Sequence, residues 1–583
     1  MIPSWRAFCL ATALAAWVGA ARGEYRDDIG FTLLQQELGS ATPDGAGVWV
    51  AHVESRTDTA NPDAFPNFLP DTTLGEFAGK QLLAISLNGQ VSNHATLVGR
   101  RFYGNETSMA TGIANVGVYW TDDWLAGGFL KANVAAAPLK SSYRVFNHSW
   151  VGANGDTIDV LRRTDYVVET YDQIQVAAVN NDDNPTDGNN PAQPLLTSAF
   201  NVISVGLTSG EHAIGSVSQG GSYNGLRNRP HLVAPATATS NAAPVVAAAS
   251  ALLIETAHTR PELSNGAFDV ATDIGTYTVR HGETSEVIRA ALMAGAQRHD
   301  VAGYNPTARN NLDLRFGAGE IDIYNSYHIL TAGEQESVER GGDAGGIERR
   351  GFDYVSDFAS GDTATYPFMP DVNSSMLFAT LSWNIDVAGG TNVFSPTTRL
   401  SNFDLELLRL GDAGYERVAV SDGTSDTTEN LWLGDLLPGT QYALRVVRSD
   451  AFGAWDFGLA WQLTHDPDAP LFGDMNGDGG VDTTDISPFM LALTNPATYA
   501  ARFPAINAEA LGDINRDGRF DNADIDSFNV LLGGGPPLIL DTSPANTVPE
   551  PSTGMLLVAT FAGCFVPTWL RRKAARRVSV RNS

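Results

Sequence analysis

The sequence predicts three successive folded units: an α/β domain built on a parallel sheet, an all-β sandwich, and a small module of loop–helix units. Three observations support this prediction. Between about residues 40 and 335, apolar strand patterns alternate with helix patterns, as in a sheet with crossover helices. From 345 to 465, short alternating stretches follow one another with turns between them. Between 467 and 535, an acidic loop followed by a helix occurs twice.

Composition narrows the range of functions. The chain has 583 residues and 43% hydrophobic residues, enough for several ordinary cores. Its net charge of -29 argues against a nucleic acid partner, because a phosphate backbone must be met by Lys and Arg. The two cysteines, Cys9 and Cys564, lie in apolar terminal segments. We therefore expect neither a disulfide nor a cysteine nucleophile in the body of the chain.

Residues 1–23 have the pattern of a signal peptide. Arg6 precedes an apolar stretch at 8–18, and small residues follow at 19–21. We expect this segment to direct export and to be removed. The alternative is an uncleaved membrane anchor.

Within 40–335, individual elements can be placed by their patterns. Strands are expected at 47–53, 81–87, 143–147, 174–179 and 202–205, and helices at 242–256 and 286–296. The helix at 242–256 is apolar on all sides, which indicates a buried helix. Parallel strands need crossover connections, so the helices between the strands are expected to cross over the sheet.

The region 345–465 reads as a sandwich of short antiparallel strands. Strands are expected at 374–383, 403–409, 431–433, 442–447 and 455–462. This pattern predicts a fold class and no chemistry.

The two acidic loops, 474–485 and 513–524, follow one design. Each has oxygen side chains at loop positions 1, 3, 5, 9 and 12, a glycine at 6 and an apolar residue at 8, which is the pattern of a calcium-binding EF-hand loop. The expected calcium ligands are Asp474, Asn476, Asp478, Gly480, Asp482 and Asp485 in the first loop, and Asp513, Asn515, Asp517, Arg519, Asp521 and Asp524 in the second, with Gly480 and Arg519 acting through their carbonyls. The alternative is two acidic surface turns.

The repeated unit resembles a type I dockerin. A helix follows each loop, at 486–493 and 525–532, and position 12 is Asp where an EF-hand usually has Glu. The resemblance implies bound calcium and a possible cohesin-like partner domain.

The C-terminal end has an ordered pattern of its own. A linker at 536–547 precedes the motif VPEPST, an apolar run at 554–570 and a basic tail, together spanning 548–583. By itself this pattern predicts a membrane anchor with its basic end in the cytoplasm. It also resembles the PEP-CTERM sorting signal, which implies transient membrane insertion, processing by an exosortase-type enzyme, and a final place in the cell envelope or outside the cell. The alternative is a plain tail anchor.

Four positions could supply the parts of a serine acyl-transfer site. Glu54 ends an apolar strand, His94 opens a helix, Asn181 follows a buried strand, and Ser240 begins the buried helix. Such a site needs a hydroxyl, a base, a group that orients the base, and donors for the oxyanion. Taken singly, each position has an ordinary structural explanation; a serine before a helix, for example, is often only an N-cap.

Taken together and in this order, the segments resemble the subtilase family. The stretch NHATLVG matches the family's histidine box at His94, and TSNAAP matches its serine box at Ser240. The resemblance implies Ser240 as nucleophile, His94 as general base, Glu54 as the orienting group and Asn181 as oxyanion donor. The stretch FNHSW matches the strand that lines the substrate cleft, which implies substrate contacts by Ser149 and Trp150. His52 and His148 are expected to be structural.

The resemblance spans about 290 residues and sharpens the fold class. It implies a subtilisin-like parallel sheet with helices on both faces, followed by the all-β sandwich and the EF-hand-like dockerin module. The sequence departs from the family pattern at several positions: Glu54 replaces an Asp, Leu97 replaces a second His, and Ala95, Ala238 and Asn180 replace glycines.

We therefore expect an exported serine endopeptidase that hydrolyses peptide or protein substrates through an acyl-enzyme with a Ser-His-Glu triad. The alternative is a catalytically inactive surface protein of the same fold, used for calcium-dependent binding or adhesion. The two differ in whether Ser240 reacts.

Overall fold

The computed structural model describes residues 25–57, 65–152, 157–181, 195–299, 301–307, 310–390, 393–411, 413–465 and 470–533. The predicted signal peptide, the linker at 536–547 and the sorting tail lie outside these residues.

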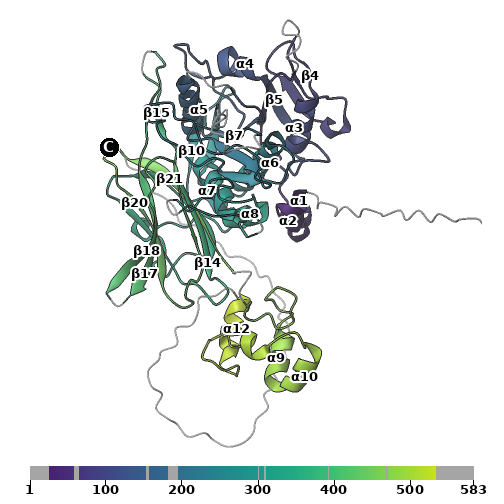
Figure 1. Ribbon diagram of the computed structural model, residues 1–583, viewed down its shortest axis with the longest axis vertical. Helices are drawn as coiled ribbons and strands as arrows, with labels where there is room; N and C mark the ends of the chain where they lie inside the picture. Colours follow the sequence, from purple (N-terminus) through teal and green to yellow (C-terminus); the bar gives the residue numbers. More distant parts are fainter. Residues whose placement is uncertain are drawn as a thin grey trace, which may run out of the picture. The chain divides into compact units, whose positions relative to one another are not determined.

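The first unit is built on a seven-stranded parallel sheet, as the sequence predicted (Figure 1). In spatial order its strands are β3 (Gln81–Ala84), β5 (Asn115–Trp120), β1 (Val50–Glu54), β6 (Val145–His148), β7 (Ile174–Ala178), β8 (Ile203–Leu207) and β9 (Leu232–Ala234). Two short strand pairs accompany it: β2 (Asn67–Leu69) with β4 (Gln90–Val91), and β10 (Ala267–Ala271) with β11 (Thr276–Arg280). The carboxyl ends of parallel strands meet at one edge, where β1 and β7 deliver Glu54 and the segment leading to Asn181.

Helices cover both faces of this sheet, which confirms the predicted fold class. The helices are α1 (Tyr25–Asp28), α2 (Phe31–Leu38), α3 (Asn93–Tyr103), α4 (Thr121–Asp123), α5 (Ile158–Tyr171), α6 (Thr239–Thr259), α7 (Ser285–Gly295) and α8 (Ile323–Thr331). Alternate residues of β1 point to opposite cores, Val50 into the one that contains α6 and Ala51 into the one that contains α5. Both faces of the strands are buried, as expected of a parallel sheet between helices.

The structure adds elements that the sequence patterns did not reveal. Strand β5 lies between the predicted strands β3 and β1, and β9 forms the edge of the sheet beside β8. Helix α2 packs into the main core through Phe31 and Leu34, so this unit includes residues before the predicted start near 40.

Helix α6 is the central helix of the first unit. Among the described residues it is the one helix that is long and apolar enough to cross a bilayer, and 83% of that apolar window is buried inside the protein. The helix begins at Thr239, ahead of the predicted range, which puts Pro244 in its second turn rather than the first. Pro244 has no N–H to offer the carbonyl of Ser240, four residues earlier.

The second unit is a sandwich of two antiparallel sheets, as predicted. One sheet contains β12 (Arg350–Phe358), β21 (Trp455–Thr464), β14 (Met376–Ser382) and β19 (Thr428–Leu433); the other contains β13 (Thr363–Phe368), β20 (Tyr442–Arg448), β17 (Phe403–Gly411) and β18 (Gly414–Ser421). A hairpin of β15 (Asp386–Ala388) and β16 (Thr397–Arg399) extends from it. Side chains from both sheets, including Trp383, Phe403 and Trp461, form the core between them.

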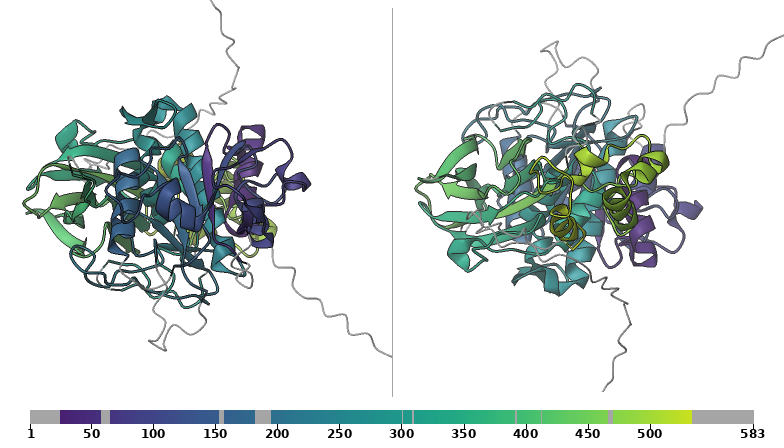
Figure 2. Two further views of the ribbon diagram at one scale, coloured as in Figure 1. Left: turned by 90° about the horizontal axis from the view of Figure 1, so that it is seen from above. Right: turned by 90° about the horizontal axis from the view of Figure 1, so that it is seen from below.

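Buried charged groups tie the sandwich to the α/β unit. Arg289 of α7 donates to Ser382 Oγ at 2.7 Å and to the Trp383 carbonyl at 2.6 Å. Arg229 forms a buried salt bridge with Asp426 at 2.9 Å. A buried guanidinium that loses its partner is costly, so these contacts hold the two units in one arrangement. Figure 2 shows the green strands of the sandwich beside the teal helices of the α/β unit.

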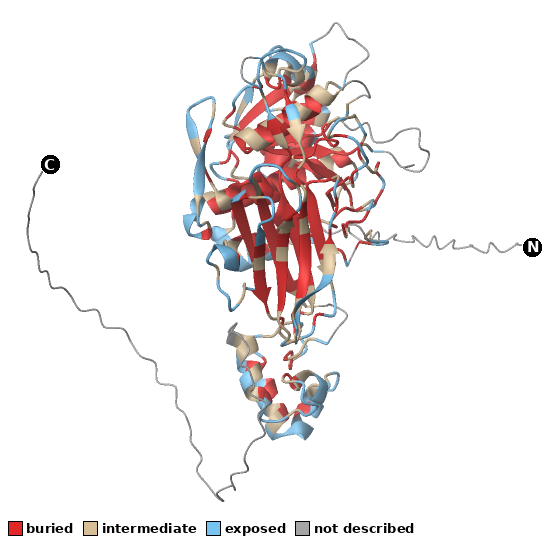
Figure 3. Cartoon of the chain, turned by 90° about the vertical axis from the view of Figure 1, so that its left-hand side faces the viewer, coloured by how far each residue is buried: buried red, intermediate tan, exposed pale blue. Residues whose placement is uncertain are grey.

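The last described unit is a small helical module. Its helices are α9 (Ile486–Thr494), α10 (Pro496–Arg502), α11 (Ala508–Gly512) and α12 (Asp524–Gly533). The rings of Phe489 and Phe528 stack at 4.1 Å between centroids, which joins the two predicted helices. Helices α10 and α11, between the two loops, were not predicted. Figure 3 shows the buried strands in red and the largely exposed outer turns of this module in pale blue.

Candidate active site

The centre of the site is a short hydrogen bond between Glu54 and His94. Glu54 ends β1 and its side chain is 1% exposed, while the His94 ring is 33% exposed. The distance from His94 Nδ1 to Glu54 Oε1 is 2.7 Å. A carboxylate accepts only, so Nδ1 carries the proton and the lone pair of His94 lies on Nε2. This is the tautomer that a general base for a serine needs.

The local sequence explains where His94 lies. The N-cap of α3 is Ser92, whose Oγ accepts the N–H of Ala95 at 3.2 Å, so the histidine occupies the first turn. The hydrogen bond to the Glu54 carboxylate raises the pKa of His94, and partial burial opposes this only in part. The carboxylate therefore stabilises the imidazolium that forms when His94 accepts a proton.

A second histidine holds the other oxygen of Glu54. His52 Nε2 lies 3.1 Å from Glu54 Oε2, and His52 Nδ1 lies 3.0 Å from the hydroxyl of Tyr103. Because Glu54 cannot donate, His52 donates from Nε2 and accepts the Tyr103 proton at Nδ1. Burial raises the pKa of Tyr103 well above its usual value, which keeps this hydroxyl protonated.

His52 had been expected to be structural, and its contact with the carboxylate is what the sequence analysis missed. The only available signal was its position two residues before Glu54, because alternate residues of a strand share a face. Burial alone would raise the pKa of Glu54, but the hydrogen bonds from His52 and His94 outweigh it and lower that pKa. Glu54 is thus held ionised by two imidazoles.

Ser240 lies in the first turn of α6 and is half-buried. Its carbonyl, which Pro244 leaves without a helical partner, accepts the hydroxyl of Ser149 at 2.8 Å. Asn147 Nδ2 in turn donates to Ser149 Oγ at 2.9 Å. Ser149, predicted to bind substrate, therefore also supports the backbone of the predicted nucleophile.

Asn181 is anchored directly beside Ser240. Its side-chain oxygen accepts the backbone N–H of Thr239 at 2.7 Å and the Thr239 hydroxyl at 3.0 Å. The side chain is exposed, and among the described residues its Nδ2 makes no hydrogen bond. The orientation of this amide leaves its donor hydrogens available for an anion beside the helix start.

His94 and Ser240 each lie in the first turn of their helix, and these helices, α3 and α6, pack against one another. Within the described residues no hydrogen bond joins the two side chains. Hydrogen bonds of this kind are often long before substrate binds and shorten in the complex.

Trp150, the other predicted substrate contact, is 7% exposed and packs in the core that contains α5. Its Nε1 donates to Nδ1 of His148 at 3.2 Å. Burial lowers the pKa of His148 to about 3, so this histidine stays neutral and has a structural role, as expected. A substrate contact by Trp150 would therefore involve its backbone.

The two predicted calcium loops have matching internal hydrogen bonds. The N–H of Gly479 donates to Asp474 at 3.0 Å, and the N–H of Gly518 donates to Asp513 at 3.0 Å. Both glycines have positive φ, 86° and 87°, with nothing within 4 Å of a Cβ position, so backbone conformation rather than space requires glycine there.

The twelfth position of each loop is a buried carboxylate. Asp485 and Asp524 are fully buried, and each accepts backbone N–H groups from its own loop. Burial raises the pKa of both, and the neighbouring Asp474 and Asp513 raise it further.

The donor set fits calcium, since hard carboxylate oxygens gather with too few positive partners, and Asp513 Oδ1 is buried without a hydrogen bond. The remaining ligand candidates, Asn476, Asp478, Gly480, Asp482, Asn515, Asp517, Arg519 and Asp521, lie in these same loops. As the side chains stand, however, no group of three or more His, Cys, Asp or Glu within the described residues is close enough to hold a metal ion.

Comparison with known families gives one match. Residues 75–319 match the model of the subtilase family. This segment is therefore similar to the serine protease domain of that family. The matched segment contains His94, Asn181 and Ser240, while Glu54 lies before it.

Solved structures similar to the chain include a serine protease of Aeromonas sobria, which is 13% identical. The similarity covers 72% of this chain and 89% of that protease, with a TM-score of 0.28. A cold adapted subtilisin-like serine proteinase is 17% identical over 45% of this chain and 86% of its own, with a TM-score of 0.27. The PatG macrocyclase in complex with peptide is 13% identical over 52% and 95%, with a TM-score of 0.32. No curated protein matches the chain.

Proposed function

We propose that the subtilase domain is an active serine endopeptidase with the triad Ser240, His94 and Glu54. The observation that carries this proposal is the 2.7 Å hydrogen bond from His94 to the buried Glu54. It fixes the imidazole in the tautomer that can take a proton from a serine. A surface protein that had lost its chemistry would have no need of an ionised carboxylate buried behind a histidine, because such burial costs free energy.

In the proposed reaction, Ser240 Oγ attacks the carbonyl carbon of a peptide bond and its proton passes to Nε2 of His94. Glu54 stabilises the resulting imidazolium through Nδ1. The tetrahedral oxyanion receives a hydrogen bond from Asn181 Nδ2, at the start of α6 where free N–H groups favour negative charge.

The intermediate collapses when His94 gives its proton to the leaving amine, which breaks the C–N bond and leaves an ester on Ser240. Water then attacks this ester with His94 again as base. The second collapse returns the proton to Ser240 and releases a carboxylic acid.

His52 provides a second partner for Glu54, whose side chain is longer than that of Asp. Glu is one methylene longer than the Asp of the family pattern, and His52 holds the oxygen that His94 does not use. We infer that His52 is a positioning residue that keeps Glu54 fixed and ionised.

Labelling with a fluorophosphonate probe tests the nucleophile. The purified full chain should be labelled, and Ser240→Ala should abolish labelling without changing the melting temperature. Ser250→Ala, within the same helix but buried in the core, is the matched control and should label like the wild type. Equal labelling of wild type and Ser240→Ala, or labelling of neither, would sink the proposed mechanism. Labelling of neither would favour the inactive binding protein instead.

We also propose that the protein is exported and that the loops at 474–485 and 513–524 each bind one calcium ion. Their carboxylates and carbonyls would hold the ion, which would neutralise the charge gathered there. The proposals of export and of a place in the envelope rest on the sequence patterns at 1–23 and 548–583. The exosortase-type processing enzyme is proposed from the resemblance of the tail to a sorting signal, and the cohesin-like partner from the resemblance of the loops to a dockerin.

A further inference from the structure

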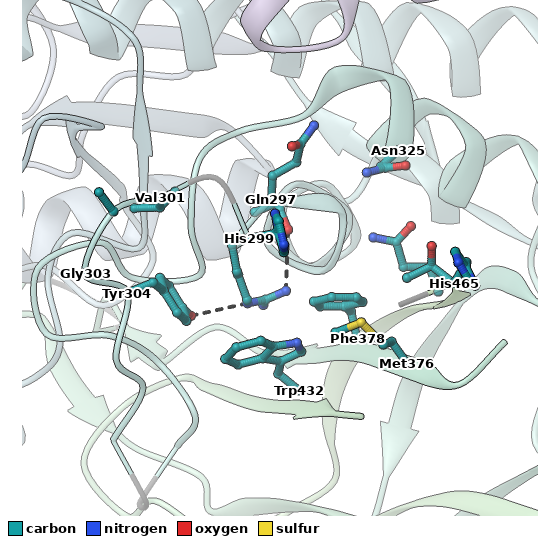
Figure 4. A pocket seen from close by; sticks show the side chains of 15 residues that line it. Gln297, His299, Val301, Gly303, Tyr304, Asn325, Met376, Phe378, Trp432 and His465 are labelled. Atoms are coloured by element: carbon teal, nitrogen blue, oxygen red, sulfur yellow. Dashed lines mark hydrogen bonds between the residues drawn. The ribbon is translucent and has the colours of Figure 1, made fainter. Parts of the chain in front are cut away.

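A pocket of about 720 Å³ lies between the α/β unit and the outer face of the sandwich, separate from the residues of the proposed triad. One wall is formed by residues 296–299 and 301–304, and the other by β14, β19 and β21. This volume is within the range of small-molecule sites. Figure 4 shows the rings of Phe378 and Trp432 next to one another, with Tyr304 beside Trp432.

The pocket contains a buried cation for which the described residues supply no acidic partner. Arg298 is 4% exposed and lines the pocket. Its Nε donates to the hydroxyl of Tyr304 at 3.2 Å and its Nη1 to the carbonyl of Ala296 at 3.4 Å. Among the described residues Arg298 forms no salt bridge, and its Nη2 makes no hydrogen bond. A buried guanidinium without a counter-ion is costly.

Aromatic faces compensate for this charge only in part. The guanidinium of Arg298 lies 4.6 Å from the ring centre of Phe378 and 5.9 Å from that of Trp432. Cation–π contacts of this kind contribute less than a paired carboxylate in the same surroundings.

The described lining residues carry no negative charge. In a chain of net charge -29, none of the lining residues that the structure describes is Asp or Glu. The lining polar atoms that are buried without a hydrogen bond include the acceptor Gln462 Oε1 and the donor Trp432 Nε1. Gln462 is 3% exposed, and its Nε2 is already committed to the carbonyl of Ala294 at 3.0 Å.

We propose that this pocket binds an organic carboxylate whose body next to the acid group is apolar. The carboxylate pairs with Arg298 Nη2, the apolar body lies against Met376 and Phe378, and an N–H or O–H of the ligand donates to Gln462 Oε1. This chemistry is shared by a free small acid and by the C-terminal residue of a peptide. The proposal does not depend on the proposed catalytic triad.

Calorimetric titration of the full chain carrying Ser240→Ala, in calcium, tests the site with three probes. N-acetyl-phenylalanine has the acid, the ring and the amide N–H; N-acetyl-phenylalaninamide lacks the acid. We expect the acid to bind at least roughly tenfold more tightly than the amide. Equal binding of the two, or binding of neither, would overturn the proposal. 3-Phenylpropionate lacks the amide: weaker binding than N-acetyl-phenylalanine identifies a peptide C-terminus, and equal binding identifies a small free acid.

Variants locate the binding in the pocket. Arg298→Gln should remove the preference for the acid, while Arg260→Gln, a change at an arginine that pairs on the surface with Glu262, should keep it. If Arg298→Gln does not fold, Trp432→Phe keeps a smaller aromatic ring and removes the Nε1 donor, which is buried at the pocket without a partner and is free to bond the acid; it should weaken binding of the acid several-fold. An unchanged preference in the folded Arg298→Gln protein, or unchanged affinity in Trp432→Phe, would show that the acid binds elsewhere.

Discussion

The proposed active site and the two acidic loops both bury carboxylates, and they differ in how the charge is satisfied. Glu54 has two imidazole partners from the protein itself, and its pKa is lowered despite complete burial. Asp485 and Asp524 have only backbone N–H partners and an acidic neighbour each, and their pKa is raised. The comparison teaches that the fold supplies the partners of Glu54 itself, whereas it supplies Asp485 and Asp524 with no positively charged partner among the described residues.

The largest expected effect concerns Glu54. Glu54→Gln should lower kcat by about 10⁴-fold, because an amide can donate and allows the wrong tautomer of His94. Peptide turnover measures this. Glu283→Gln is the matched control, since Glu283 is another buried carboxylate bonded to a histidine, His258, at 2.9 Å. Full activity in Glu54→Gln would mean that Glu54 does not orient the base.

The next effect concerns the oxyanion. Asn181→Ala should lower kcat by about 10²–10³-fold with little change in KM, because its donor acts only on the charge of the transition state. Asn180→Ala, one residue earlier, is the control and should have a smaller effect. A change confined to KM would assign Asn181 to substrate binding instead.

Calcium removal should lower the stability of the module with the two acidic loops and leave the proposed active site unchanged. With calcium at about 100 times its dissociation constant, binding contributes about 2.7 kcal/mol to the stability of the module. EDTA should therefore lower the melting temperature of its transition in the full chain. A variant with both Asp485→Asn and Asp524→Asn should lose this response while its turnover stays unchanged. A melting curve that EDTA leaves unaltered would count against both loops.

Loss of His52 would remove one of the two imidazole donors of Glu54, so that this carboxylate, like those of the acidic loops, would have fewer partners. His52→Phe leaves Glu54 Oε2 buried without a donor, which should cost about 1–3 kcal/mol of unfolding free energy and reduce kcat. His52→Gln can still donate and should recover part of both losses. If the Phe variant loses stability while kcat stays at the wild-type value, His52 supports the fold and not the orientation of Glu54.

The smallest effect is a shift of the acid limb of the pH profile. The neutral form of His94 is the base, so kcat/KM rises as pH passes its pKa, which Glu54 raises. The residual activity of Glu54→Gln should therefore rise at lower pH than that of the wild type. If the acid limb of Glu54→Gln lies at the same pH as that of the wild type, Glu54 does not raise the pKa of His94.

The sequence alone was sufficient for the fold classes. Alternating apolar patterns identified most strands of the parallel sheet and of the sandwich, because burial imposes a period of two on a strand with one apolar face and a continuous apolar run on a strand buried on both. It also indicated Glu54, His94, Asn181 and Ser240, which lie at strand ends and helix starts. Their spacing along the chain carried no information about their distances.

Only the tertiary structure decided which side chains meet. The bond of His52 to Glu54, the support of Ser240 by Ser149, and the burial of Arg298 away from any described carboxylate all depend on atoms from segments packed against one another. Burial patterns report that a residue is inside, and they are the same for a histidine that fills space and for one that holds a carboxylate. The partner of a buried polar group is set by distance and direction in three dimensions, which a linear pattern does not contain.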